Sequence, residues 1–405
     1  DYPICRPSLD LDFTQEVLDP RITFSRGSIG TRVNRNRLIE TISANQPRFD
    51  YDPVTGECKG LLIEESRSNS LLYSADTSNA AWGGKSTVII GSTITAPDGT
   101  NTAYKVIENT SNVIHNTNQS VGTISGTYTV SCFVKAGERY RGYIQIFGAG
   151  GNVRAAFNLK TGTITGGSGT NTITPYPNGW YRVTSTGTFT SATAACYLVI
   201  YNDNGVGTYT GDGSSGLYFW GAQVEAGAFP TSYIPTTAST VTRTADLASI
   251  TGTNFSSWYN QTEGTFFFDG SLAFSSNVGG VPFGVSNGFN FPNSIYYSKA
   301  TTSLAITFSV VNSNVSQSSV SGGGNMTSSN FKIASSVAPR NIYTSLYGGI
   351  IKHSISSASI PTADRLTLGR APWNSGATNV IIGCIRRFVY YPKALSPSEL
   401  QYLTT

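Results

Sequence analysis

The sequence predicts an all-β protein in which a small N-terminal module precedes two β-sandwich (jelly-roll) domains. Val, Ile, Thr, Tyr and Phe alternate with clusters of Gly, Asn and Ser, which is typical of short strands joined by turns. The chain has 43 Gly, a single Met and few Leu, Glu or Lys, so long helices are not expected. Its 405 residues suffice for two or three domains of about 100–200 residues each.

Charge density sets residues 1–72 apart as a predicted N-terminal anchoring or docking module. They hold 20 of the 50 charged side chains, and the other 333 residues hold 30. Apolar and acidic side chains alternate over residues 9–13, which predicts a half-buried strand. Residues 52–56 read as a turn and residues 60–65 as a buried strand that runs into charge. Because the segment is short and strand-poor, we expect it to pack on its neighbour domain or on another chain.

Residues 73–237 form the predicted middle domain, where short strands recur about every 8–12 residues, as in a sandwich or barrel. The expected strands are 128–134, 143–147, 155–159, 180–184, 196–201 and 217–224. The Thr-rich stretch 236–244, which follows two prolines, is typical of a linker.

Residues 243–405 form the third predicted domain. Its expected strands are 264–269, 303–311, 331–334, 342–347, 365–369 and 383–391. One clear helix signal follows, because Ser396 can cap a helix, Pro397 suits its first position, and Glu399 can complete a capping box. Few residues remain after it, so we expect one or two turns.

Charge and hydropathy exclude two classes of partner. The net charge is only +4 and no segment concentrates Lys and Arg, so no nucleic-acid surface is predicted. No stretch approaches the roughly 18 apolar residues of a membrane span, so we expect no membrane insertion. The chain starts at Asp1 without an initiator Met or an apolar signal region, so we expect it to be processed, trimmed or a fragment.

The cysteines and histidines argue against metal, redox and triad chemistry. The five cysteines are scattered, and no pair has the two-residue spacing of a zinc or redox motif. We therefore expect reduced, mostly buried thiols, as in a protein made in a cytoplasm. With only two histidines, a histidine metal site or a Ser-His-Asp triad is not expected.

Motifs in all three segments resemble known families. Four spaced motifs (9–14, 21–26, 45–53 and 60–65) make residues 8–82 similar to a module common in tailed-bacteriophage virion proteins. The middle segment resembles the jelly-roll carbohydrate-binding modules of the same phage proteins, through residues 131–137, 179–183, 218–227 and 229–236. Residues 383–391 and 393–400 look like the end of a concanavalin A-like, laminin-G-type sandwich.

These resemblances imply a virion surface protein, made in the host cytoplasm and assembled as a homotrimer with other virion proteins. A tail fibre or receptor-binding protein that adheres to host-surface glycans is the leading interpretation. A capsid decoration or head-fibre protein attached to the shell is the alternative, and a polysaccharide depolymerase is a third. Neither the location on head or tail nor the glycan follows from the sequence.

Paired carboxylates, which a glycoside hydrolase needs on one face of a strand, are not evident. No Glu-x-Asp-x-Glu pattern or close variant occurs. Glu263 and Asp269 stand six residues apart on either side of a Phe run. Glu64 and Glu65 are adjacent and would point to opposite faces. We therefore predict no enzyme activity and no catalytic residue.

An acidic loop around Gly56 departs from a calcium-binding loop. Asp50, Asp52 and Glu57 surround this Gly, but it stands at the seventh position and the twelfth-position Glu is missing. A turn with a solvated acidic face is the better interpretation, so no metal ligand and no cofactor is predicted. Because jelly-roll carbohydrate modules often carry one structural calcium, a site at Asp212 and backbone carbonyls stays open.

Loop aromatics are the strongest candidates for recognition. The apolar faces of sugar rings stack on Trp and Tyr, and sugar hydroxyls bond to Asn, Asp, Gln and Arg. Trp180 and Trp220 lie in strand patterns and are predicted to be core. The predicted carbohydrate-binding residues lie in loops, with a structural or subunit contact as the alternative; they are Tyr209, Asp212, Trp373 and Asn374.

Overall fold

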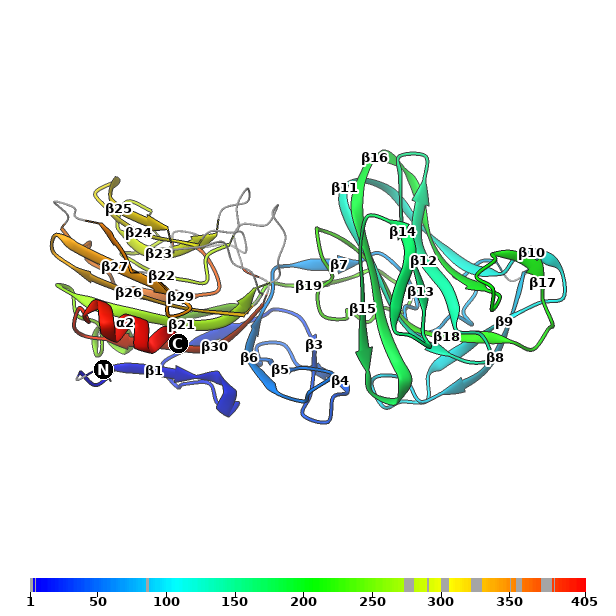
Figure 1. Ribbon diagram of the computed structural model, residues 1–405, viewed down its shortest axis with the longest axis horizontal. Coiled ribbons are helices and arrows are strands. Elements are labelled where there is room, and N and C mark those ends of the chain that lie inside the picture. The colour runs from blue at the N-terminus through cyan, green and yellow to red at the C-terminus, as the bar shows by residue number, and fades with distance from the viewer. Residues whose placement is uncertain are drawn as a thin grey trace.

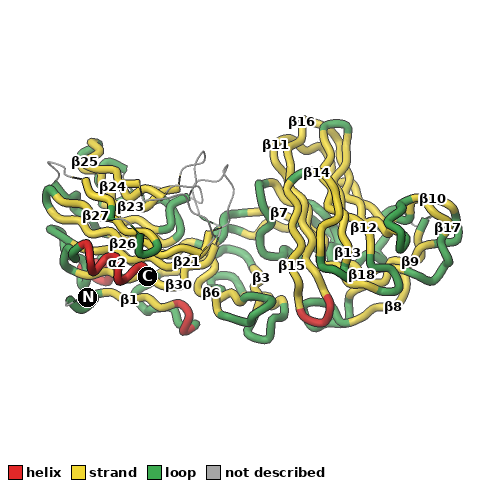
Figure 2. Tube along the Cα trace, in the orientation of Figure 1, coloured by secondary structure: helices red, strands yellow, loops and turns green. Residues whose placement is uncertain are grey.

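The computed structural model describes residues 3, 5–84, 87–272, 280–289, 291–299, 306–321, 330–349, 351–354, 359–372, 381 and 383–405. It confirms the all-β fold class, with several antiparallel sheets and short helices. The molecule has two lobes side by side, and strands dominate both of them (Figures 1 and 2). Both ends of the chain lie in one lobe, and the middle of the chain forms the other.

The lobe that holds both chain ends, here called the host sandwich, consists of two packed sheets. One has the order β28-β27-β26-β21-β30-β6-β5 with β1 on β30, and the other has the order β2-β20-β29-β22-β23-β24-β25. The strands of the first are β1 (Leu9–Asp12), β5 (Phe49–Tyr51), β6 (Cys58–Ile63), β21 (Gly264–Leu272), β26 (Asn330–Ala338), β27 (Asn341–Leu346), β28 (Lys352–Ser354) and β30 (Gly383–Tyr391). Those of the second are β2 (Thr23–Ser25), β20 (Leu247–Thr251), β22 (Phe283–Ser286), β23 (Ser294–Lys299), β24 (Ile306–Asn312), β25 (Val315–Ser321) and β29 (Arg365–Leu368).

An aromatic core fills the space between these two sheets. Phe266 and Phe268 alternate along β21 and are fully buried. The ring of Phe283, from the opposite sheet, lies 5.3 Å from Phe266 and 4.8 Å from Phe388. Because aromatic rings bury large apolar areas, these side chains contribute strongly to the packing of the two sheets.

Residues 1–72 do not stand apart as a module, which corrects the division of the chain into three consecutive domains. β1 pairs with β30, β6 pairs with β30 and β2 pairs with β20. Leu9 and Leu61 are buried in the same core as the Phe residues above. Gly60 permits the close approach of β6, because a Cβ there would lie 2.1 Å from the Ile385 carbonyl oxygen. The segment therefore packs on the C-terminal domain, which is far from it in the chain, rather than on the domain that follows it in sequence.

The middle domain is an insertion into the host sandwich. The chain leaves along β7 (Arg67–Asn69) and returns along β19 (Val241–Arg243), and these two strands pair antiparallel between the lobes (Figure 1). They lie next to the boundaries at 72 and 243 suggested by composition. There are also two-stranded sheets, formed by β3 (Gly30–Val33) with β4 (Ile39–Ile42) and by β10 (Asn112–Ile114) with β17 (Thr208–Thr210).

Two long strands, β11 (Asn116–Ala136) and β16 (Trp180–Tyr201), roll the inserted sheet into two layers. They pair along nearly their whole length, with register shifts between Ser120 and Gly122 and between Ile124 and Gly126 that bend the ribbon. One layer then has the order β14-β13-β12-β16-β11, and the other adds β15, β18, β9 and β8. These strands are β8 (Val88–Ile94), β9 (Ala103–Glu108), β12 (Arg141–Gly148), β13 (Gly151–Asn158), β14 (Thr163–Ser168), β15 (Thr170–Tyr176) and β18 (Gly216–Ala226).

Several local predictions are confirmed. Trp180 and Trp220 are 1 % and 2 % exposed, as expected of core residues. Helix α2 (Pro397–Thr404) begins after Ser396 with the predicted capping box to Glu399. The remaining helices are one-turn elements, α1 (Thr253–Ser256), η1 (Phe13–Gln15) and η2 (Pro177–Gly179). All five cysteines are free and three of them are buried. Among the described residues, no helix has the length and apolar character needed to cross a membrane.

Candidate functional site

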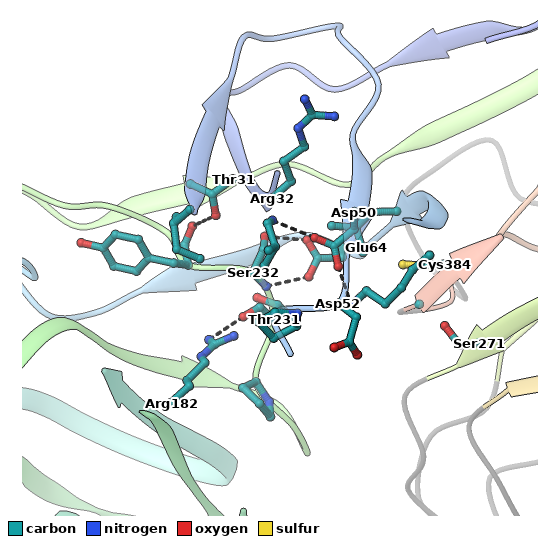
Figure 3. A pocket seen from close by; sticks show the side chains of 18 of the residues that line it. Thr31, Arg32, Asp50, Asp52, Glu64, Arg182, Thr231, Ser232, Ser271 and Cys384 are labelled. Atoms are coloured by element: carbon teal, nitrogen blue, oxygen red, sulfur yellow. Dashed lines mark hydrogen bonds and ion pairs between the residues drawn. The ribbon is translucent and has the colours of Figure 1, made fainter. Parts of the chain in front are cut away.

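A cavity of about 450 Å³ lies where the two lobes meet (Figure 3). Its walls come from β3, from the loop between β5 and β6, from residues 230–233 near the end of the inserted domain, and from the start of β30. Most of its lining side chains are polar or charged. The cavity therefore raises the question of whether these groups are free to act on a ligand.

Glu64 lies beside this cavity and is fully engaged. Its carboxylate accepts hydrogen bonds from the Ser232 backbone N–H and hydroxyl, both at 2.7 Å. It also lies 2.8 Å from Arg48 and 2.6 Å from Arg243. Burial alone would raise the pKa of Glu64, but the two guanidinium groups and the Ser232 donors lower it to about 2. Glu64 is therefore a permanent anion at the junction.

Asp246 extends this group into a buried ionic network. Its carboxylate accepts from Arg26 at 3.0 Å, from Arg48 at 2.5 Å and from the Glu64 backbone N–H at 2.9 Å. The side chains of Asp246, Arg26 and Arg48 are completely buried. The five members of this junction network are Arg26, Arg48, Glu64, Arg243 and Asp246. They come from both ends of the chain, so the network joins the two segments on either side of the insertion.

The acidic loop predicted around Gly56 forms a turn in the cavity wall. Asp52 accepts backbone hydrogen bonds from Val54 at 2.8 Å and Thr55 at 2.9 Å. Asp50 instead points inward, where it accepts from the Val33 N–H at 2.8 Å and pairs with Lys59 at 2.6 Å. Within the described ranges, no three His, Cys, Asp or Glu side chains are grouped to hold a metal ion. Asp50 and Asp52 are therefore both engaged by hydrogen-bond donors or cations of the protein itself.

Tyr209 and Asp212, two of the predicted carbohydrate contacts, come together around Glu108; Tyr209 lies in strand β17 rather than in the predicted loop, and Asp212 follows that strand. The Tyr209 hydroxyl donates to the Glu108 carboxylate at 2.6 Å, and Asp212 donates its backbone N–H to the same group at 3.0 Å. Arg139 donates to both Glu108 oxygens, at 2.9 and 2.6 Å. Burial and the hydrogen bond to Glu108 raise the pKa of Tyr209.

This arrangement leaves little of the Tyr209 ring accessible. The residue is 8 % exposed, and its ring lies edge-on against His115 at 4.7 Å. The Asp212 carboxylate accepts from the Ser214 and Ser215 backbone N–H groups and so closes its own loop. Both residues fix local structure here, and their contact with a glycan stays a prediction. The other two candidates, Trp373 and Asn374, lie outside the described residues.

A different group of side chains gathers on the outer face of the layer β14-β13-β12-β16-β11. Residues opposite one another in antiparallel strands point to the same face. The register therefore aligns one row across the five strands, namely Asn118, Tyr197, Gln145, Arg154 and Ser168. Adjacent rows add Tyr143 and Tyr201 on one side and Phe147 and Asn152 on the other. Their neighbours along each strand, such as Ile144 and Leu198, face the core.

We name this surface the tyrosine face and define it by Arg141, Tyr143, Gln145, Phe147, Asn152, Arg154, Tyr197 and Tyr201. Tyr143 and Tyr201 meet edge to face at 5.3 Å. The Arg154 guanidinium lies 5.3 Å from the Tyr143 ring centroid, in cation–π contact. Gln145 donates to the Asn152 side-chain oxygen at 2.7 Å, and Phe147 is 52 % exposed. Aromatic rings, amides and guanidinium groups thus lie side by side on one sheet face.

The tyrosine face escaped the sequence analysis, although a signal was present. Alternate residues of β12 (Tyr143, Gln145, Phe147) are aromatic or polar and Ile144 and Ile146 lie between them, whereas in β16 the aliphatic Val199 separates Tyr197 from Tyr201 on the same face. This period of two marks an outer face with aromatic side chains. Which strands lie next to each other, and in which register, had to come from the structure.

Comparisons with known proteins give no family for the chain. No family model matches, and no curated protein matches. Among solved structures, the CBM40 module of the Ruminococcus gnavus IT-sialidase, bound to α2,6-sialyllactose, is 15 % identical over 36 % of this chain and 85 % of its own, with a TM-score of 0.32. The NanB sialidase from Streptococcus pneumoniae is 15 % identical over 39 % of this chain and 26 % of its own, with a TM-score of 0.31.

Botulinum neurotoxin type C, which depends on interaction with two ganglioside molecules to enter cells, is also similar. It is 15 % identical over 39 % of both chains, with a TM-score of 0.31. At this level of similarity none of these proteins assigns a ligand to the present chain.

Proposed function

We propose that this chain is a non-enzymatic adhesion protein of a virion surface, of the tail-fibre or receptor-binding type, and that its tyrosine face binds host-surface glycans. The observation that carries the glycan part is the row of Tyr197, Gln145 and Arg154 across three neighbouring strands. Tyrosine rings suit the apolar faces of sugars, and amide and guanidinium groups suit their hydroxyls. The resemblance of residues 8–82 to a tailed-bacteriophage module supports the virion location.

The size of the face suits an oligosaccharide. Neighbouring strands lie about 4.8 Å apart, so the five-strand row from Asn118 to Ser168 extends over about 19 Å. An open sheet face buries less of its ligand than a deep pocket does, so we expect each site to bind weakly. A Kd near millimolar corresponds to a binding free energy of about −4 kcal/mol. Closed symmetry is the default for identical chains, and we propose a homotrimer whose copies add avidity of roughly 10² or more.

The host sandwich is the part that we propose to attach to other virion proteins. It includes the charge-rich residues 1–72, whose acids and arginines outside the junction network offer polar contacts with a fixed register. A capsid decoration protein with the same adhesive domain is the alternative. A map that locates the protein on a virion would distinguish a tail from a head position.

Binding of the whole protein to a glycan array and to host cells tests the adhesive function. Tyr197→Ala removes a ring from the centre of the face and should reduce binding about tenfold, since an aromatic contact contributes about 0.5–1.5 kcal/mol. Tyr402→Ala is the matched control, because Tyr402 is 47 % exposed on α2 of the other lobe. Failure of the unaltered protein to bind any glycan or cell, or equal binding by both variants, would overturn the proposal.

A further inference from the structure

The arginines of the tyrosine face differ from the other arginines that flank strands in this protein. Several of these others face a carboxylate, as in Arg139 with Glu108 at 2.6 Å and Arg387 with Asp10 at 2.5 Å, whereas Arg182 of β16 instead donates to Ser131 and to the Thr231 carbonyl oxygen. Arg154 and Arg141 have no ion pair with any described residue. The eight residues that define the face include these two cations and no Asp or Glu. The face therefore carries positive charge that the protein itself does not neutralise.

Arg154 is held in place without its donors being used. Its guanidinium is fixed by the Tyr143 ring at 5.3 Å. Its Nε is buried and makes no hydrogen bond within the described part of the chain, and no described residue accepts from its terminal nitrogens. A guanidinium offers five N–H donors in a planar fork that matches a carboxylate in a bidentate pair. Because the Nε is buried, the two terminal nitrogens are the donors that a carboxylate can reach, and they can hold it end-on in a bidentate pair.

The neighbourhood of Arg154 adds no competing acid. Along its row, Gln145 and Ser168 stand on either side, and both are neutral. Asp203, an acid of the loop that follows Tyr201, lies 3.6 Å from Arg139, which draws it toward that cation. Lys160 lies 3.7 Å from the Tyr140 ring and adds a further cation to this side of the domain.

We propose that the glycan bound by the tyrosine face is an acidic one, and that Arg154 pairs with a carboxylate on a sugar ring. This rests on the proposed function and specifies its ligand class. A sugar whose apolar face lies against Tyr197 has Arg154 two strands away, at about 10 Å, with Gln145 between them. The neighbouring sugar of a chain then presents its carboxylate to the guanidinium, while Gln145 binds a hydroxyl.

The test is an array that carries uronic-acid and sialic-acid glycans, each printed beside its neutral methyl ester, together with sulfated glycans. The unaltered protein should retain carboxylated glycans about tenfold better than their methyl esters, and this preference should fall as salt is raised. Arg154→Gln should lose the preference, and Arg154→Lys should restore part of it, since it keeps the charge without the fork. Arg37→Gln, on the other lobe, controls for the loss of one positive charge.

The outcomes separate this inference from the proposed function. Equal binding of acids and methyl esters, or an unchanged preference in Arg154→Gln, overturns the acidic ligand and leaves glycan adhesion standing. If the protein retains only sulfated glycans, the proposed pairing of Arg154 with a sugar carboxylate is overturned. Absence of any glycan binding by the unaltered protein overturns both proposals. A change of oligomer mass in Arg154→Gln would mean that a second copy of the chain covers the face, and it also overturns the inference.

Discussion

The junction between the lobes and the tyrosine face place arginines in opposite surroundings. At the junction, Arg48 is completely buried and bonds to Asp246, Glu64 and the Thr31 carbonyl oxygen. On the face, Arg154 has one aromatic contact and no acid. A buried charge must be paired to be tolerated, whereas a charge at the surface can stay unpaired and keep its affinity for an anion. The richest concentration of charge is thus a structural joint, whereas in the middle domain Arg139 is paired with Glu108 and Arg154 has no ion pair among the described residues.

The sharpest test of this contrast is Asp246→Asn. The substitution keeps the shape of the side chain but leaves Arg26 and Arg48 without their shared anion in a buried site. We expect a loss of about 3–5 kcal/mol in the free energy of unfolding, measured by chemical denaturation. Asp10→Asn is the control, since Asp10 pairs with Arg387 at the surface and should cost less than about 1 kcal/mol. Equal losses in the two variants would contradict a buried ionic joint.

Within the inserted domain, the ring of Trp220 points into the core and the ring of Tyr197 lies on the outer face, so substitutions of the two residues can be compared. Trp220 is 2 % exposed, lies 5.5 Å from Phe133, and donates its indole N–H to Thr102 at 3.0 Å. Trp220→Ala should cost about 3–5 kcal/mol, because it opens a cavity and removes a hydrogen bond. Tyr197→Ala should cost about 1 kcal/mol and mainly impair binding. Melting curves of both variants measure this, and a larger loss for Tyr197 would make the tyrosine face a structural surface.

Low pH should destabilise the junction network by protonating Glu64. The pKa of this carboxyl is about 2 in the folded protein and 4.5 as the ordinary value. Because the pKa is lower in the folded state, ionised Glu64 stabilises the folded protein above pH 4.5. This contribution is lost as the pH falls through 2. We expect it to amount to about 3 kcal/mol. Denaturation measured between pH 6 and pH 2.5 should show the loss, and Glu64→Gln should show a flatter dependence over the same range.

The elements that the sequence predicted are those whose signal is local. The alternation at residues 9–13 gives β1, and the capping box of Ser396 and Glu399 gives α2. The pairing of Leu9 with Tyr390 has no local signal, because the two residues are brought together only by the complete sheet. The charge density of residues 1–72 therefore predicts a separate module, whereas in the structure several of these charges form one side of the junction network.

The candidate site was harder to predict for the same reason. The loop position predicted for Tyr209 suggested a ring open to solvent, but the residue lies in strand β17, and Glu108, a strand residue distant in sequence, binds its hydroxyl. The row of Tyr197, Gln145 and Arg154 depends on the register of three strands, and it places Gln145 opposite a residue more than 50 positions later in the chain, Tyr197. A pattern of alternating residues indicates that an outer face exists, and only the pairing of strands tells which side chains share it.

Arg154→Gln should have the smallest effect on stability of all these substitutions. It therefore distinguishes most clearly between a structural role of Arg154 and a role in ligand binding. At the junction, removing one member of a pair leaves a buried charge, but Arg154 has no ionic partner to leave behind among the described residues. Its loss forfeits one cation–π contact with Tyr143, worth about 0.5–1 kcal/mol at an exposed site, and relieves the cost of a buried Nε without a hydrogen bond. These two terms oppose each other, so the free energy of unfolding should change by less than about 0.5 kcal/mol. Chemical denaturation beside Asp246→Asn measures the difference directly. A loss as large as that of Asp246→Asn would mean that Arg154 supports the sheet itself, and its unpaired charge would then have a structural explanation.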